Sequence, residues 1–123
     1  MTTLVVKEDS VALITAELVD EANLPVTSSR VTAIRMWLYD QNGAIINGRT
    51  DTDILNANGG EIDGSGNFSL RLTASDNPIV GVGSDNIEPH TLLIRKVWDA
   101  SNPQQDWDEI DLRVRNLKRV PVS

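Results

Sequence analysis

The sequence predicts an all-β fold in which two antiparallel sheets, with about seven strands in total, pack into a sandwich. Residues 59–73 change abruptly from a cluster of Gly, Asp, Ser and Asn to strict alternation of apolar and polar residues. The same two-residue period recurs along the chain, as expected of strands that bury one face. No segment shows a convincing helical period. These observations favour strands joined by turns over any fold that contains helices.

Each predicted strand is a short apolar or alternating segment between turn-forming residues. The segments are residues 4–6, 11–19, 31–39, 44–46, 68–72, 91–99 and 110–116. The first is short enough to be an edge strand. In residues 31–39, Ile34, Met36 and Leu38 form one face, so Trp37 falls on the other. Residues 91–99 carry apolar side chains on both faces, which is typical of a central strand.

The connections between these segments are also informative. Asn42-Gly43 is a strong hairpin signal between two apolar runs. Residues 74–89 form a long connection, which suits a crossover between two sheets better than a hairpin. Residues 99–108 read as a polar loop. This arrangement predicts an immunoglobulin-like sandwich, although the chain has no cysteine for a disulfide and carries His90 where such domains often have a tyrosine.

Composition limits the function classes. The 123 residues contain no repeat or linker, so we expect one domain, with extended arms at residues 1–7 and 118–123. Without cysteine there can be no zinc–thiolate site, iron–sulfur cluster or thiol catalysis. The sequence shows no basic leader and no apolar run of about 20 residues, so we expect no membrane association. The net charge of −7 argues against nonspecific nucleic-acid binding.

Basic residues nevertheless concentrate in predicted strands. They are Arg35, Arg71, Arg95, Arg113 and Arg115. One interpretation is that they cover a solvated face and pair with Glu17 or Asp111 across strands. The other is a basic sheet face that docks on an acidic partner surface. We take Arg35, Arg71, Arg113 and Arg115 as candidate partner-binding residues.

Trp107 is the fifth candidate partner-binding residue. It lies in the predicted polar loop between Asp106 and Asp108. An exposed tryptophan can anchor a protein interface or stack on a sugar. It can also simply cover one end of the sandwich.

No catalytic residue is predicted. His90 is the only histidine, and no Gly-x-Ser-x-Gly motif accompanies it. Gly64-x-Gly66 precedes a strand and lacks the lysine of a phosphate-binding loop. We therefore expect a protein that is not an enzyme and has no cofactor.

Calcium binding is a weak alternative for the Asp- and Asn-rich connections. Asp51, Asp53, Asn56 and Asn58 are closely spaced, but the bidentate glutamate of an EF-hand is missing. Asp, Asn and Gly are also the residues that turns require. The sequence favours turns here and predicts no metal site.

Three segments resemble a family of small immunoglobulin-like structural proteins encoded by tailed bacteriophages. The segments are DILNANGGEIDGSGNFSLRLT (residues 53–73), SDNPIV (75–80) and EIDLRVRNL (109–117), within a resemblance that spans about residues 31–121. The resemblance implies a protein located in the virion and assembled in the bacterial cytoplasm. It implies a capsid decoration or cement protein that binds the major capsid protein or another virion protein and stabilises the head.

Other assignments stay open at this point. A tail or neck module belongs to the same structural class, whereas a carbohydrate-binding or adhesion module would use Trp107. A homotrimer would match local three-fold sites of a capsid. The family supplies no catalytic residues.

Overall fold

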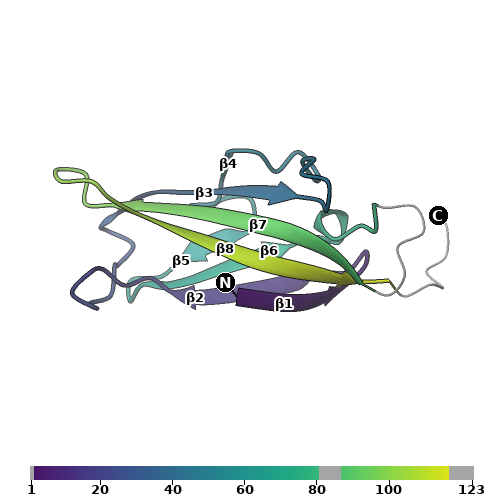
Figure 1. The fold of residues 1–123 in the computed structure, drawn as a ribbon. Coiled ribbons are helices and arrows are strands. Elements are labelled where there is room, and N and C mark those ends of the chain that lie inside the picture. The colour runs from purple at the N-terminus through teal and green to yellow at the C-terminus, as the bar shows by residue number, and fades with distance from the viewer. Residues whose placement is uncertain (1, 81–86, 117–123) are drawn as a thin grey trace.

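The computed structural model describes residues 2–80 and 87–116, which form two sheets packed face to face (Figure 1). The large sheet has the strand order β1-β8-β7-β3-β4, and the small sheet has the order β2-β6-β5. The strands are β1 (Thr2–Lys7), β2 (Ala12–Glu17), β3 (Val31–Tyr39), β4 (Thr52–Asp53), β5 (Gly60–Ile62), β6 (Asn67–Leu72), β7 (Ile87–Trp98) and β8 (Gln104–Arg115). The short 3₁₀ helix η1 (Ala74–Asp76) follows β6. The predicted all-β sandwich is confirmed.

The strand order is that of an immunoglobulin-like sandwich. The connection from β6 to β7 crosses from the small sheet to the large one, as the length of this segment predicted. The long strands β7 and β8 run along most of the domain (Figure 1). Among the described residues, no helix has the length and apolar character needed to cross a membrane.

Strand β1 corrects two expectations. It pairs with β8 in parallel, from Thr2 opposite Ile110 to Lys7 opposite Arg115, so the large sheet is mixed. This is possible because β1 and β2 belong to different sheets and no hairpin constrains their directions. Residues 2–7 are therefore an edge strand and not an extended arm. The second predicted arm, residues 118–123, lies outside the described residues.

Two predicted assignments are corrected by the structure. Residues 44–46 form no strand; Ile45 makes an isolated bridge with Tyr39. Residues 104–108 belong to β8 and not to a loop, because each pairs with a residue of the long strand β7. Backbone pairing with an ordered neighbour outweighs the polar composition of this segment. Trp107 therefore lies in a strand.

The core is formed by the inward-facing residues that the alternation predicted. Ile34, Met36 and Leu38 of β3 are fully buried. Leu70 and Leu72 of β6 face them from the small sheet and are also fully buried. Burial of such side chains stabilises the sandwich by about 1.5–3 kcal/mol each.

A buried ion pair holds three connections together. The Arg49 guanidinium donates to both carboxylate oxygens of Asp76, with Nε–Oδ1 and Nη2–Oδ2 distances of 2.9 Å. Asp76 is inaccessible to solvent, and it also accepts hydrogen bonds from the Asn47 side chain and the backbone N–H of Thr73. Arg49 Nη1 donates to the carbonyl of Asn58. The pair thus joins η1 to the chain on both sides of β4.

These contacts set the ionisation of Asp76. Burial raises the pKa of its carboxyl, but the hydrogen bonds from Arg49, Asn47 and Thr73 and the charge of Arg49 outweigh burial. The pKa therefore lies below its ordinary value. A lowered folded-state pKa means that this stabilisation is present above the unfolded-state pKa and is lost as the pH falls through the folded one.

We expect Asp76→Asn to lower the free energy of unfolding by about 3–5 kcal/mol at neutral pH, because Arg49 would stay buried without a countercharge. The variant should also show a weaker loss of stability than the wild type as the pH falls below about 4. Urea denaturation at several pH values measures both. Asp111→Asn, which breaks the more exposed pair with Arg113, is the control and should cost about 1 kcal/mol or less. Equal losses in the two variants would contradict this account.

Gly60 lies where two backbones approach closely. A Cβ at this position would overlap the carbonyl oxygen of Ile54 and lie 2.8 Å from its Cβ. A Cβ at Gly64 would meet nothing within 4 Å. We expect Gly60→Ala to destabilise the domain by about 1–3 kcal/mol through overpacking, and Gly64→Ala to leave stability nearly unchanged. Thermal unfolding of both variants tests this, and a Gly60→Ala protein as stable as the wild type would refute it.

Candidate functional site

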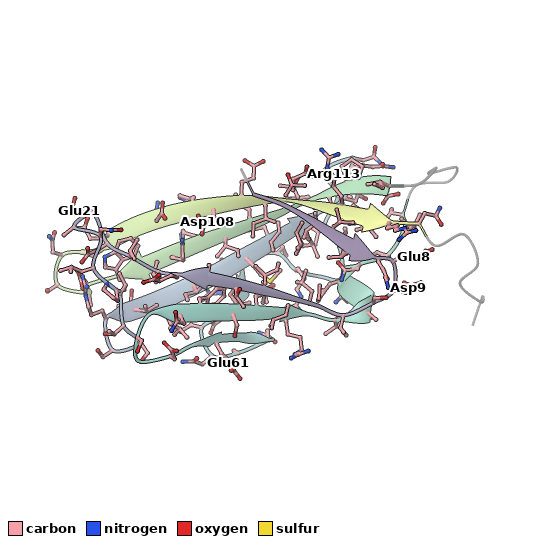
Figure 2. All side chains as sticks on the ribbon, turned by 90° about the horizontal axis from the view of Figure 1, so that it is seen from below. Glu8, Asp9, Glu21, Glu61, Asp108 and Arg113 are labelled. Atoms are coloured by element: carbon pink, nitrogen blue, oxygen red, sulfur yellow. The ribbon has the colours of Figure 1, made fainter. Side chains whose placement is uncertain are left out.

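Alternate residues of β1, β8, β7 and β3 point away from the core and form the outer face of the large sheet. Its central residues are placed by register: Trp107 lies beside Arg95, and Arg95 lies beside Arg35. In the next row, Leu93 lies between Glu109 and Trp37. Figure 2 shows Arg113 of β8 and Glu61 of β5 on opposite sides of the sandwich.

Two tryptophans and two arginines meet at the centre of this face. The ring centroids of Trp37 and Trp107 are 5.5 Å apart, with an angle of 35° between the planes. The guanidinium carbon of Arg95 lies over the Trp107 ring, 5.9 Å from its centroid. Trp107 is 45% exposed, so the group is open to a partner. We call Arg35, Trp37, Arg95 and Trp107 the Trp–Arg cluster.

The outer face is rich in basic residues although acidic residues outnumber basic ones by 18 to 11 in the whole chain. Its basic residues are Lys7, Arg35, Arg95, Arg113 and Arg115. The acidic side chains of the same rows are Glu109 and Asp111, with Asp53 at the β4 edge and Asp51 beside Arg35. The local charge therefore has the opposite sign to that of the protein.

Three basic residues elsewhere in the described chain, Arg30, Arg49 and Lys96, have structural partners. Arg30 pairs with Asp20 and Asp99, and Lys96 pairs with Asp106 and Asp108. On the outer face Arg113 contacts Asp111 at 3.0 Å, and Arg35 lies 3.9 Å from Asp51. On this face Arg95 and Arg115 have no carboxylate partner among the ion pairs of the described residues, so they remain available to an external partner.

The structure brings four of the five predicted site residues onto one face. Trp107, Arg113 and Arg115 come from β8 and Arg35 comes from β3. Arg71 is the exception: it lies on the outside of the small sheet, in an open groove of about 1140 Å³. The interpretation that Arg71 shares one basic face with the other candidate arginines is therefore wrong.

Two members of the cluster were not selected from the sequence. Arg95 and Trp37 both stand opposite the expected core face of predicted strands, and that signal was available. The strand register could not be predicted from the sequence. This register places Arg95 beside Trp107 and brings Trp107 near Trp37.

His90 is fully buried and not at the protein surface. Its Nε2 lies 2.6 Å from Oε1 of Glu88, which is equally buried and accepts a hydrogen bond from the backbone N–H of Val80. The Glu88 carboxylate thus joins the start of β7 to Val80 of the preceding connection. An imidazole without contact with solvent is not presented to a substrate in this conformation.

The Asp- and Asn-rich connections form turns. Asp51, Asn56 and Asn58 adopt positive φ values of 45°, 53° and 52°. The Asp63 carboxylate accepts hydrogen bonds from the backbone N–H groups of Asn67 and Ser65, and the contacts with Asn67 are the main cause of its lowered pKa. Within residues 2–80 and 87–116, no group of three or more His, Cys, Asp and Glu is placed to hold a metal ion.

No protein-family model matches the chain, and no curated protein matches its sequence. The outer face of the large sheet is therefore interpreted from its geometry and charge.

We expect the Trp–Arg cluster to contribute little to folding. Trp107→Ala removes one aromatic contact and one cation–π contact at a half-exposed site, so it should cost about 1–2 kcal/mol. Trp98→Ala is the matched control, because Trp98 is only 5% exposed and its loss should cost about 3–5 kcal/mol. Thermal unfolding of the two variants measures the difference. A Trp107→Ala loss as large as that of Trp98→Ala would make Trp107 a core residue.

Proposed function

We propose that this chain is a non-enzymatic virion structural protein of a tailed bacteriophage, a capsid decoration protein that binds the major capsid protein and stabilises the head. The binding surface is the outer face of the large sheet. The observation that carries this proposal is the exposed Trp–Arg cluster at the centre of that face. The placement on the capsid comes from the sequence resemblance.

The cluster has the composition of a protein interface. Tryptophan and arginine are the residues most enriched among those that dominate binding energy. Arg35 and Arg95 lie directly opposite each other on neighbouring strands, and like charges in such positions destabilise a sheet. The pair therefore does not contribute to the stability of the sheet. A binding role explains why it is present.

The sheet is also a suitable support for such a surface. The cluster lies on β3, β7 and β8, the interior strands of the five-stranded sheet. The backbone of paired strands is already ordered, so binding a partner requires ordering of the exposed side chains only. On a capsid, symmetry repeats each contact many times, so a modest surface is sufficient for stable attachment.

Protein contact suits the cluster better than sugar stacking. Sugar stacking requires a free face of the aromatic ring, whereas Arg95 lies over the Trp107 ring. Trp37 approaches the same ring at 5.5 Å. These contacts place the 45% exposed Trp107 within a mixed basic and apolar surface, which is typical of interface anchors.

Co-sedimentation with empty shells assembled from the cognate major capsid protein tests the proposal. The wild-type protein should sediment with the shells and raise their temperature of disruption. Trp107→Ala should reduce binding at least about tenfold, as expected for an anchor residue worth about 2 kcal/mol. Arg71→Ala lies on the other side of the molecule and should bind like the wild type.

The same proteins distinguish the alternatives. Binding to tail or neck assemblies without binding to shells would move the chain to that part of the virion. Binding on a glycan array that Trp107→Ala abolishes would instead indicate a carbohydrate-binding module. Either result would overturn the assignment to the capsid.

A further inference from the structure

Carboxylates are strong partners of guanidinium groups. Among the described residues, no carboxylate lies within hydrogen-bond distance of the Arg35 or Arg95 guanidinium group. Arg35 Nη1 donates to the backbone carbonyl of Asp51 at 2.9 Å, and the Asp51 carboxylate is 3.9 Å away. Arg95 Nε is buried and has no hydrogen-bond partner among the described residues. The main contact of Arg95 is with the face of the Trp107 ring.

Nearby carboxylates do not complete this pair. Asp53 is the cross-strand neighbour of Arg35, but its Oδ1 accepts the backbone N–H of Leu55. Glu109 lies in the next row, beside Leu93. Neither forms an ion pair with Arg35 or Arg95 in the part of the chain that the structure describes. Arg95 therefore has no ion-pair partner among the described residues, and the only carboxylate paired with Arg35 is that of Asp51, at 3.9 Å.

We propose that the Trp–Arg cluster recognises an acidic segment of the partner protein. Carboxylate groups of the segment pair with Arg35 and Arg95, and an apolar side chain packs on Trp37, Trp107 and Leu93. This inference rests on the proposed function and names the chemistry of its partner. Guanidinium groups bind carboxylates through two parallel hydrogen bonds, and the adjacent rings exclude water from them.

The charge distribution favours a short acidic segment over a polyanion. The protein carries a net charge of −7, and Asp51, Asp53 and Glu109 border the arginine pair. A nucleic acid extends far beyond a cluster of this size and would meet these carboxylates and the acidic remainder of the surface. An acidic segment places only a few charges, and it can place them at the two arginines.

Titration with a pair of short synthetic peptides tests this inference. In one peptide glutamate alternates with leucine, and in the other glutamine replaces glutamate. We expect the glutamate peptide to shift the Nε–H resonances of Arg95 and the indole N–H resonance of Trp107. Arg95→Gln should weaken binding about tenfold, which corresponds to the loss of one charge-assisted interaction. Arg95→Lys should be intermediate, because it keeps the charge and loses the paired hydrogen bonds.

Matched controls separate recognition from general charge effects. Arg71→Gln removes the same charge from the opposite face and should not change the affinity. Added salt should weaken binding of the glutamate peptide, because the site is exposed. Equal affinities for the two peptides, no binding of the glutamate peptide, or equal losses in Arg95→Gln and Arg71→Gln would each overturn the inference. Tighter binding of single-stranded DNA than of the glutamate peptide would also overturn it.

The outcomes are independent of the capsid experiment. If shells bind through Trp107 but the glutamate peptide does not bind, the proposed function stands and the acidic ligand is wrong. If the glutamate peptide binds through Arg95 but shells do not, the chemistry of the ligand stands and the assignment to the capsid is wrong.

Discussion

The register of β7 against its two neighbours is the constraint on which the rest of the structure depends. Pairing with β3 and β8 places Leu92 and Ile94 in the core and, on the opposite face, Leu93 and Arg95 in the outer surface. Because side chains alternate, a shift of one residue would exchange these two sets. The apolar core therefore fixes the positions of the exposed arginines and tryptophans. The same hydrophobic burial that stabilises the domain also assembles its candidate binding site.

Buried polar groups hold the ends of this framework. Arg49 and Asp76 join η1 to the connections around β4, and Glu88 with His90 secures the start of β7 after the crossover. Each charged or polar atom in the Arg49–Asp76 pair has close partners, so its burial is compensated. The outer face has the opposite character, since its basic residues have few internal partners. This contrast separates residues that maintain the fold from residues available for binding.

Sequence periodicity was a good predictor of the strands that bury one face. It was a poor predictor of the polar or irregular strands. Residues 31–39 match β3 because apolar residues alternate there throughout. Residues 104–108 were assigned to a loop because they are polar, yet they extend β8 by pairing with β7. The candidate site followed the same division. Of the five candidate residues, Trp107 and three arginines share the outer face of the large sheet, whereas Arg71 belongs to the small sheet. Arg95 was not among the candidates.

The sequence by itself determined the fold class, the core faces of the main strands and the turns, because each depends on residues close together in the chain. Only the tertiary structure decided the parallel pairing of β1, the partner of Asp76 and the meeting of Trp37 with Trp107. These features join segments far apart in sequence. Many pairings would satisfy the same local pattern, and packing of the whole domain selects among them.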